Sequence, residues 1–119
     1  MSKKTKVPEF KGKFDGKGKK FDSEKNRLEL IPPEAIEELG WVYTYGAQKY
    51  ADNNWLRGLD YTKLIGAIKR HLLAIEKGQD IDPEFQLLHA AHGAWSFLAL
   101  VQFMKHPERY KQFDNRVFK

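Results

Sequence analysis

The sequence predicts an all-α fold, a small bundle of three to four main helices with a basic, largely extended N-terminal arm. Apolar residues recur at helical spacing in three long segments, and no segment alternates apolar and polar residues as a half-buried strand would. The length of 119 residues suits one domain. Cysteine is absent, which excludes a disulfide framework and a thiolate metal site. We therefore expect residues 1–20 to form a flexible arm and residues 21–119 to form a single all-α domain.

The positive charge of the chain is concentrated in the predicted arm. Residues 1–20 carry eight lysines and two acids, whereas residues 21–119 carry 13 Lys and Arg against 14 Asp and Glu. Such an arm favours phosphate-rich partners, including nucleic acid, through counterion release. A solvated tail without a partner is the alternative. The near-neutral remainder argues against nucleic-acid binding as the main role.

No segment suits a membrane span. The N-terminus lacks the apolar core of a signal peptide, and the most apolar stretch, Ala94–Met104, is too short to cross a bilayer. Together with the missing cysteines, this pattern fits a reducing cytosol. We expect a cytoplasmic protein that has no membrane partner.

The first helix is predicted over residues 33–50, after an extended segment at residues 21–33. Pro32 and Pro33 open it because proline is tolerated in the first turn, and the acids that follow suit the positive end of the helix dipole. The main apolar stripe of this helix contains Leu39, Val42, Tyr43, Gly46 and Tyr50. A second stripe mixes carboxylates, aromatics and a lysine, as a site lining does: Glu34, Glu38, Trp41, Tyr45 and Lys49.

Two further helices follow. The second is predicted from Asp60 or Tyr61 to Lys77, with Gly78 as the residue that ends it. The third is predicted from residue 83 or 84 to residue 104 or 105, and the His106-Pro107 pair ends or kinks it. It is apolar nearly all round, so we expect it to be the central, buried helix. The last residues are predicted to add a short turn of helix.

Three histidines are predicted to point inward. His71 lies near the centre of the apolar face of the second helix, and His89 and His92 share a face of the third helix at spacing i, i+3. A lone inward histidine is usually a core residue with a satisfied partner. Burying three imidazoles costs desolvation unless each finds a partner, so the group favours shared metal or acid–base chemistry.

Acidic residues lie within reach of these histidines. The loop between His71 and His89 contains Asp80, Asp82 and Glu84, which could supply oxygen ligands to Mg²⁺ or Mn²⁺. Helix-capping duty for Asp82 and a solvated loop are the alternative. The same alternative applies to the glutamates at the start of the first helix, Glu34, Glu37 and Glu38.

Aromatic and basic residues suggest a nucleotide site. Tyr50, Asn54 and Trp55 suit a wall that stacks on a base and reads its edge, although Trp55 is equally suited to anchor the loop in the core. Four cations are candidate triphosphate contacts: Lys25, Arg27, Lys49 and Arg70. The phosphate-loop, dinucleotide-fingerprint, His-Asp and HExxH motifs are all absent from the sequence.

The ordered motifs of residues 20–105 resemble the phage-associated dATP/dGTP diphosphohydrolase family, which is similar to the all-α, MazG-like nucleotide pyrophosphohydrolases. The resemblance is carried by Lys20-Phe-Asp, Lys25-x-Arg27, Leu30-Ile-Pro32, Tyr45-Gly-Ala-x-Lys49-Tyr50, Asn54-Trp55-x-x-Gly58, Arg70-His71-Leu-Leu-Ala74, Gly78-x-Asp80-x-Asp82-Pro-Glu84 and His89-x-x-His92. It implies hydrolysis of a deoxynucleoside triphosphate to the monophosphate and pyrophosphate with Mg²⁺ or Mn²⁺, by a dimer or tetramer, in the host cytoplasm if the protein is phage-encoded.

The resemblance also shows departures. MazG-like enzymes hold metal with an ExxE pair and an ExxD pair. Glu34-x-x-Glu37 fits the first spacing, but His89-x-x-His92 stands where the second is expected. A further departure is Phe85-Gln86, where the family tends to have a Thr-Gly turn.

These observations assign three sets of candidate residues. The candidates for catalysis are Glu37, Glu38, His71, His89 and His92. The candidates for metal binding are Glu34, Glu37, Glu38, His71, Asp82, His89 and His92. The candidates for substrate binding are Lys25, Arg27, Lys49, Tyr50, Asn54, Trp55 and Arg70. Two other functions remain open: a phage protein that binds a nucleotide or nucleotide signal without catalysis, and a small nucleic-acid-binding protein that uses the lysine-rich arm.

Overall fold

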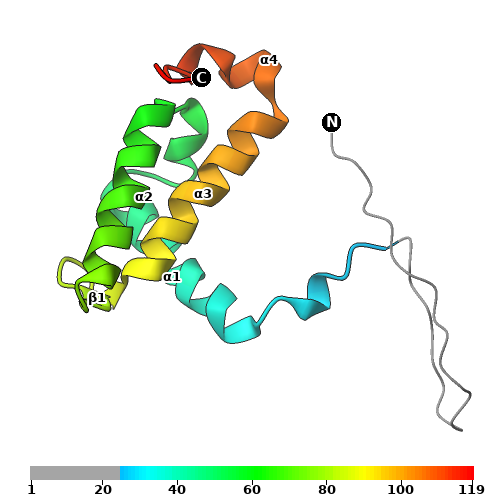
Figure 1. Cartoon of the computed structure of the whole chain (residues 1–119). Coiled ribbons are helices and arrows are strands. Elements are labelled where there is room, and N and C mark those ends of the chain that lie inside the picture. The colour runs from blue at the N-terminus through cyan, green and yellow to red at the C-terminus, as the bar shows by residue number, and fades with distance from the viewer. Residues whose placement is uncertain (1–24) are drawn as a thin grey trace, which may run out of the picture. The chain divides into compact units, whose positions relative to one another are not determined.

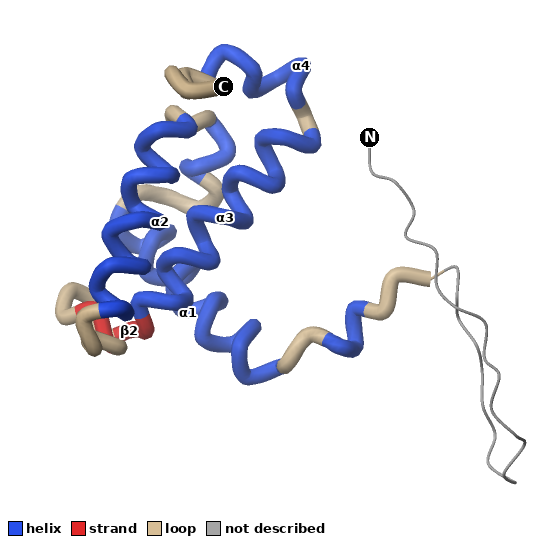
Figure 2. The backbone as a smooth tube through the Cα atoms, viewed as in Figure 1, coloured by secondary structure: helices blue, strands red, loops and turns tan. Residues whose placement is uncertain are grey.

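A computed structural model of the chain describes residues 25–119, and these residues are mainly helical. The predicted arm, residues 1–20, lies outside the described residues. The chain divides at Pro33, where the helical unit Pro33–Lys119 begins. Its order is α1 (Pro33–Lys49), the 3-10 helix η2 (Asn54–Arg57), α2 (Tyr61–Glu76), β1 (Ile81–Asp82), β2 (Leu87–Leu88), α3 (His89–Lys105), α4 (Pro107–Tyr110) and the 3-10 helix η3 (Lys111–Phe113). The all-α prediction is confirmed, with one small two-stranded sheet added to it (Figure 2).

Residues 25–32 form a different local structure from the extended segment that the sequence predicts. Leu28–Leu30 is a turn of 3-10 helix, η1, closed by hydrogen bonds from the Leu30 amide to the Arg27 carbonyl and from the Ile31 amide to the Leu28 carbonyl. Ile31 then returns to extended backbone, as a residue before proline prefers.

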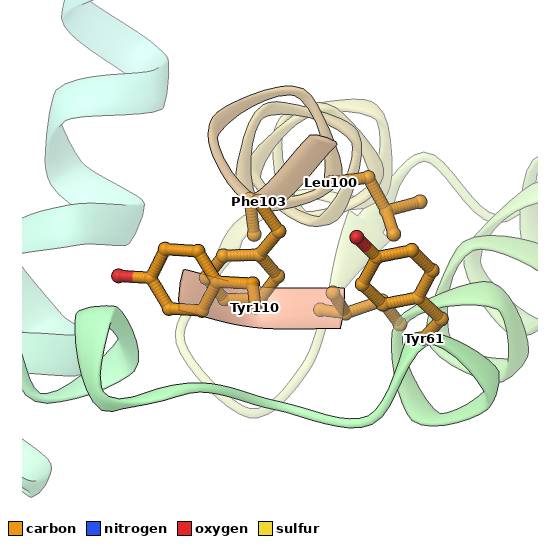
Figure 3. Close-up of a cluster of buried hydrophobic side chains, with 6 residues drawn as sticks. Tyr61, Leu100, Phe103 and Tyr110 are labelled. Carbon is orange, nitrogen blue, oxygen red and sulfur yellow. The ribbon is translucent and has the colours of Figure 1, made fainter. Parts of the chain in front are cut away.

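The third helix is central, as predicted, but it is not buried on all sides, because Phe97, Val101 and Met104 are about half exposed. α3 packs along α2 and also contacts α1 and α4, and Figure 1 shows α2 and α3 side by side. The largest core cluster joins α2, α3 and α4 through Tyr61, Leu64, Ala99, Leu100, Phe103 and Tyr110. The Phe103 ring lies between the rings of Tyr61 and Tyr110 (Figure 3), with its centroid 6.4 Å and 4.4 Å from theirs. A second cluster joins α1 to the sheet and to α3 through Val42, Leu87 and Ala91.

The predicted start of the third helix at residue 83 or 84 is wrong. Asp82 Oδ1 accepts a hydrogen bond from the Glu84 amide at 2.9 Å, and the Gln86 amide donates to the Asp82 carbonyl, so a helical turn does begin here. It ends after that one turn because Gln86 has φ +58°, in the left-handed region. β1 and β2 then pair antiparallel, and the helix begins only at His89.

The C-terminal segment packs onto η2, the start of α2 and the loop between them. The Tyr110 hydroxyl donates to the Leu56 carbonyl, and the Asn115 side-chain oxygen accepts a hydrogen bond from the Thr62 amide at 3.0 Å. The Phe113 ring lies so close to Gly58 that no other side chain fits there without a shift. This segment therefore fixes the position of η2. Among the described residues, no helix has the length and apolar character needed to span a membrane.

Candidate functional site

The chain between α2 and α3 is shaped to bring distant side chains together. α2 ends in a Schellman turn, in which Gly78 has φ +88° and the Gln79 amide donates to the Ala74 carbonyl at 2.9 Å. The prediction that Gly78 ends this helix is therefore confirmed. The short sheet then returns the chain, and the His89 amide donates to the Asp80 carbonyl at 2.9 Å. The first turn of α3 is thereby placed against the last turns of α2.

The three predicted histidines converge on Asp82. Its Oδ2 atom lies 4.0 Å from His71 Nδ1, 4.0 Å from His89 Nδ1 and 3.8 Å from His92 Nε2. The two Nδ1 atoms of His71 and His89 are 2.8 Å apart, so one proton lies between them. The rings of His71 and His92 stack with centroids 5.1 Å apart and planes 10° from parallel. The inward projection of all three histidines is confirmed.

Burial favours the neutral form of His71 in this cluster. Desolvation lowers the pKa of His71, and the neighbouring His92 and His89 lower it further, while the Asp82 carboxylate opposes them. His71 therefore presents a neutral imidazole, the form that binds metal. His92 Nε2 is buried and has no hydrogen-bond partner among the described residues. A buried nitrogen without a partner is costly, so its position favours a bound ion or water beside it.

One group within the cluster has the geometry of a metal site. His71, Asp82 and His92 each offer a donor atom, and these atoms all lie within 4.8 Å of one another. Two imidazole nitrogens and a carboxylate oxygen are a donor set that transition ions such as Mn²⁺ accept. These residues fit a divalent ion. His89 is outside this group and instead bonds His71 and the Gln79 side chain.

His71, Asp82 and His92, the candidate metal-binding group, also line a cavity of about 910 Å³. Its lining joins the ends of α1 and η2 to the histidine cluster: Val42, Tyr43, Thr44, Gly46, Ala47, Lys49, Tyr50, Ala51, Asp52, Asn53, Asn54, Trp55, Leu59, Arg70, His71, Asp82, Glu84, Phe85, His92 and Trp95. The lining combines aromatic side chains, the three candidate metal ligands and two cations, Lys49 and Arg70. This combination suits a ligand with a flat ring and several phosphates.

Five of the seven predicted substrate-binding residues line this cavity together. They are Lys49, Tyr50, Asn54, Trp55 and Arg70. Lys49 Nζ donates to Glu84 Oε1 at 3.3 Å, and this bond is the main reason why the pKa of Lys49 is raised. The ammonium group of Lys49 therefore carries a positive charge at the cavity and pairs with the negative carboxylate of Glu84. A phosphate is also negative, so it could take the place of this carboxylate. Trp55 also packs on the core, so both readings of that residue are consistent with its position.

The remaining two predicted substrate contacts precede the helical unit. Lys25 and Arg27 lie in residues 25–32, where the Arg27 guanidinium pairs with Glu29 at 2.9 Å. That pair lowers the pKa of Glu29. Their role as phosphate contacts stays a prediction.

The three glutamates of α1 are not part of the His71–Asp82–His92 group. Within residues 25–119, neither the metal-binding group nor the cavity lining includes Glu34, Glu37 or Glu38. Glu38 Oε1 accepts a hydrogen bond from the Leu88 amide at 3.2 Å and so ties α1 to β2. Their metal-binding and catalytic roles stay predictions.

Several cavity residues were missed by the sequence reasoning. The Tyr43 ring lies 6.1 Å from Trp55 and 6.0 Å from Trp95, and the two tryptophans are 5.9 Å apart. Trp95 follows His92 by three residues, so the shared helix face already connected it to the site. Phe85 stacks on Tyr45 at 5.4 Å, but nothing in the sequence signalled this contact, because it depends on the turn that replaces the predicted start of α3.

Comparison with known proteins identifies the family. The dATP/dGTP diphosphohydrolase of Salmonella phage PMBT28 is 48% identical to this chain over 77 residues, which are 65% of this chain and 26% of that relative. The chain thus matches only about a quarter of the length of this curated protein. No solved structure matches the chain. The family profile described as dATP/dGTP diphosphohydrolase, N-terminal, matches residues 15–116. The chain belongs to this family, as the resemblance of its motifs predicted.

Proposed function

We propose that this protein hydrolyses a deoxynucleoside triphosphate of the dATP or dGTP type. In this reaction water adds to phosphorus, the bond between the α- and β-phosphates breaks, and the monophosphate and pyrophosphate are released. The activity for which the phage relative is named and the family membership support this substrate class. The observation that carries the proposal is that His71, Asp82 and His92 line the same cavity as several aromatic side chains.

We propose that His71, Asp82 and His92 hold a divalent ion. When bound, such an ion supplies positive charge that lowers the pKa of a water molecule and offsets charge on the phosphates. Of the two predicted ions, the nitrogen-rich donor set favours Mn²⁺ over Mg²⁺, which prefers oxygen ligands. Participation of His89 and of the α1 glutamates as further ligands or acid–base groups belongs to the same proposal.

The chain's own side chains position the substrate in this scheme. Lys49 exchanges Glu84 for a phosphate oxygen, and Arg70 contributes a planar guanidinium that pairs well with phosphate. Tyr50 and Trp55 stack on the base, and Asn54 contacts its edge. The two cations hold the phosphates while the aromatic side chains hold the base. The reacting phosphorus is therefore kept in one orientation.

Self-association is part of the proposal. α3 leaves an apolar stripe exposed, with Phe97 at 57%, Val101 at 54% and Met104 at 48% of their full accessible area. A stripe of this kind on a small protein favours pairing with a second copy, as a dimer or tetramer. We further propose that the enzyme acts in the host cytoplasm, where its nucleotide substrates are found.

A product analysis tests this function. The purified chain is incubated with each dNTP and NTP, with Mn²⁺ or Mg²⁺, and the nucleotides and phosphates are separated by anion exchange. We expect monophosphate and pyrophosphate from dATP or dGTP, and loss of both products in Asp82→Asn and His92→Ala. His106→Ala is the matched control, because this half-exposed histidine pairs with Glu108 outside the cavity. Nucleotide recovered intact after long incubation would reject hydrolysis and favour a protein that only binds.

A further inference from the structure

Gln79 contacts the histidine cluster from outside the cavity. Its Oε1 atom lies 2.9 Å from His89 Nε2. The Schellman turn at the end of α2 fixes the Gln79 backbone, and the bond between the His89 amide and the Asp80 carbonyl fixes the start of α3. Gln79 is exposed, whereas only 6% of His89 is accessible. The exposed side chain of Gln79 is thus a hydrogen-bond partner of the buried His89 imidazole.

The chemistry of this contact determines where the proton of His89 sits. An amide oxygen is only an acceptor, so His89 Nε2 must carry the hydrogen. A neutral imidazole has one N–H, so in the neutral form of His89 the Nδ1 atom is left with a lone pair. That lone pair faces His71 Nδ1 at 2.8 Å and Asp82 Oδ2 at 4.0 Å. In the metal-free protein, the proton between the two Nδ1 atoms therefore belongs to His71.

We propose that Gln79 is a positioning residue, which fixes His89 as its Nε2–H tautomer and so directs the Nδ1 lone pair of His89 toward the His71–Asp82 centre. The relay runs from Gln79 through His89 to His71, whose ring stacks on His92. The metal-binding imidazole in this relay is His71, and its direct partner is His89. Such partners hold a metal-binding imidazole in one tautomer and one orientation, and their loss weakens metal binding. The link to metal binding rests on the proposed function; the tautomers do not.

Two variants separate the acceptor role of Gln79 from its bulk. Gln79→Glu keeps an acceptor oxygen, and Gln79→Leu keeps a similar volume without one. Gln48→Leu is the matched control, because Gln48 is an exposed glutamine on α1 that does not line the cavity. Thermal unfolding followed by circular dichroism checks that each variant folds.

The first measurement is imidazole nitrogen NMR on the metal-free protein at alkaline pH. We expect Nε2–H for His89 and Nδ1–H for His71, in the wild type and in Gln79→Glu. In Gln79→Leu we expect the two tautomers of each ring to mix. A wild-type His89 that carries its proton on Nδ1 overturns the proposal, whatever its metal affinity.

The second measurement is the affinity for Mn²⁺ alone, from the electron paramagnetic resonance of the free ion. We expect Gln79→Leu to bind about 10- to 100-fold more weakly than the wild type, and Gln79→Glu to bind at least as tightly as the wild type. Equal losses of Mn²⁺ affinity in both variants would show that Gln79 acts only by packing, and would overturn the proposed relay. A wild type that has the expected tautomers but binds no Mn²⁺ rejects the proposed metal centre and leaves the tautomer assignment standing.

Discussion

Replacing Gly58 with alanine tests how the C-terminal segment holds the loop that lines the cavity. Gly58 follows η2 with φ +117° and ψ 142°, a conformation that residues other than glycine adopt only at a cost of about 1–3 kcal/mol. An alanine Cβ would also lie 2.2 Å from the Phe113 ring, so the ring must move. Overpacking of this kind costs about 1–3 kcal/mol. We expect Gly58→Ala to lower the free energy of unfolding by about 2–6 kcal/mol in total.

Urea unfolding of four variants separates the two contributions. Gly78→Ala is the control for strain alone, since Gly78 has φ +88° and no heavy atom lies within 4 Å of its added Cβ. In a Phe113→Ala background, Gly58→Ala should cost less by the overpacking energy, about 1–3 kcal/mol. Equal losses for Gly58→Ala and Gly78→Ala, with no coupling to Phe113, would refute this reasoning.

Four further outcomes are expected. Phe103→Ala should lower the free energy of unfolding by about 3–5 kcal/mol in urea titrations, because this ring is fully buried between two others; a loss below 1 kcal/mol would contradict the core. Glu84→Gln should lower the KM for a triphosphate, because it releases Lys49, and should leave the melting temperature almost unchanged; an unaltered KM would argue against this competition. Because the pKa of His71 is lower in the folded protein than its ordinary 6.5, the folded protein binds fewer protons, so stability should fall as the pH drops below that value; thermal melts of His71→Gln should show a shallower fall. Mn²⁺ at 100 times its Kd should raise the free energy of unfolding by about 2.7 kcal/mol in the wild type and not in His92→Ala, as measured by thermal melts with and without the ion.

Helical projection placed the histidines of the site correctly, because it depends only on the local geometry of each helix. The turns of α2 and α3 fix which side chains face the neighbouring helix, so His71 and His92 could be assigned to the interior from spacing alone. The end of α2 was equally predictable, since Gly78 provides the left-handed residue that its closing turn requires.

The start of α3 and the face of α1 that lines the cavity depend on features that hydrophobic periodicity cannot predict. The start of α3 was misplaced because Gln86 adopts a left-handed conformation. A glycine at this position would have indicated such a conformation, but a glutamine does not. The second stripe of α1 was expected to line a site, yet of its members only Lys49 appears in the lining formed by the described residues. Val42 and Tyr43 of the main apolar stripe line the cavity instead. Ligand pockets are commonly lined by apolar side chains, so a core-like stripe does not exclude a place in a site.

The close spacing of the histidine cluster along the chain has a consequence for folding. His71 and His89 are only 18 residues apart in sequence, whereas the Lys49–Glu84 pair, which links α1 to the chain between β1 and β2, closes a loop of 35. A shorter loop costs less entropy to close, so the hairpin of α2 and α3 can form the centre before α1 docks. An ion that binds at that stage would favour folding from this hairpin outward. Hydrogen exchange with Mn²⁺ present should then protect the facing turns of α2 and α3 more than it protects α1.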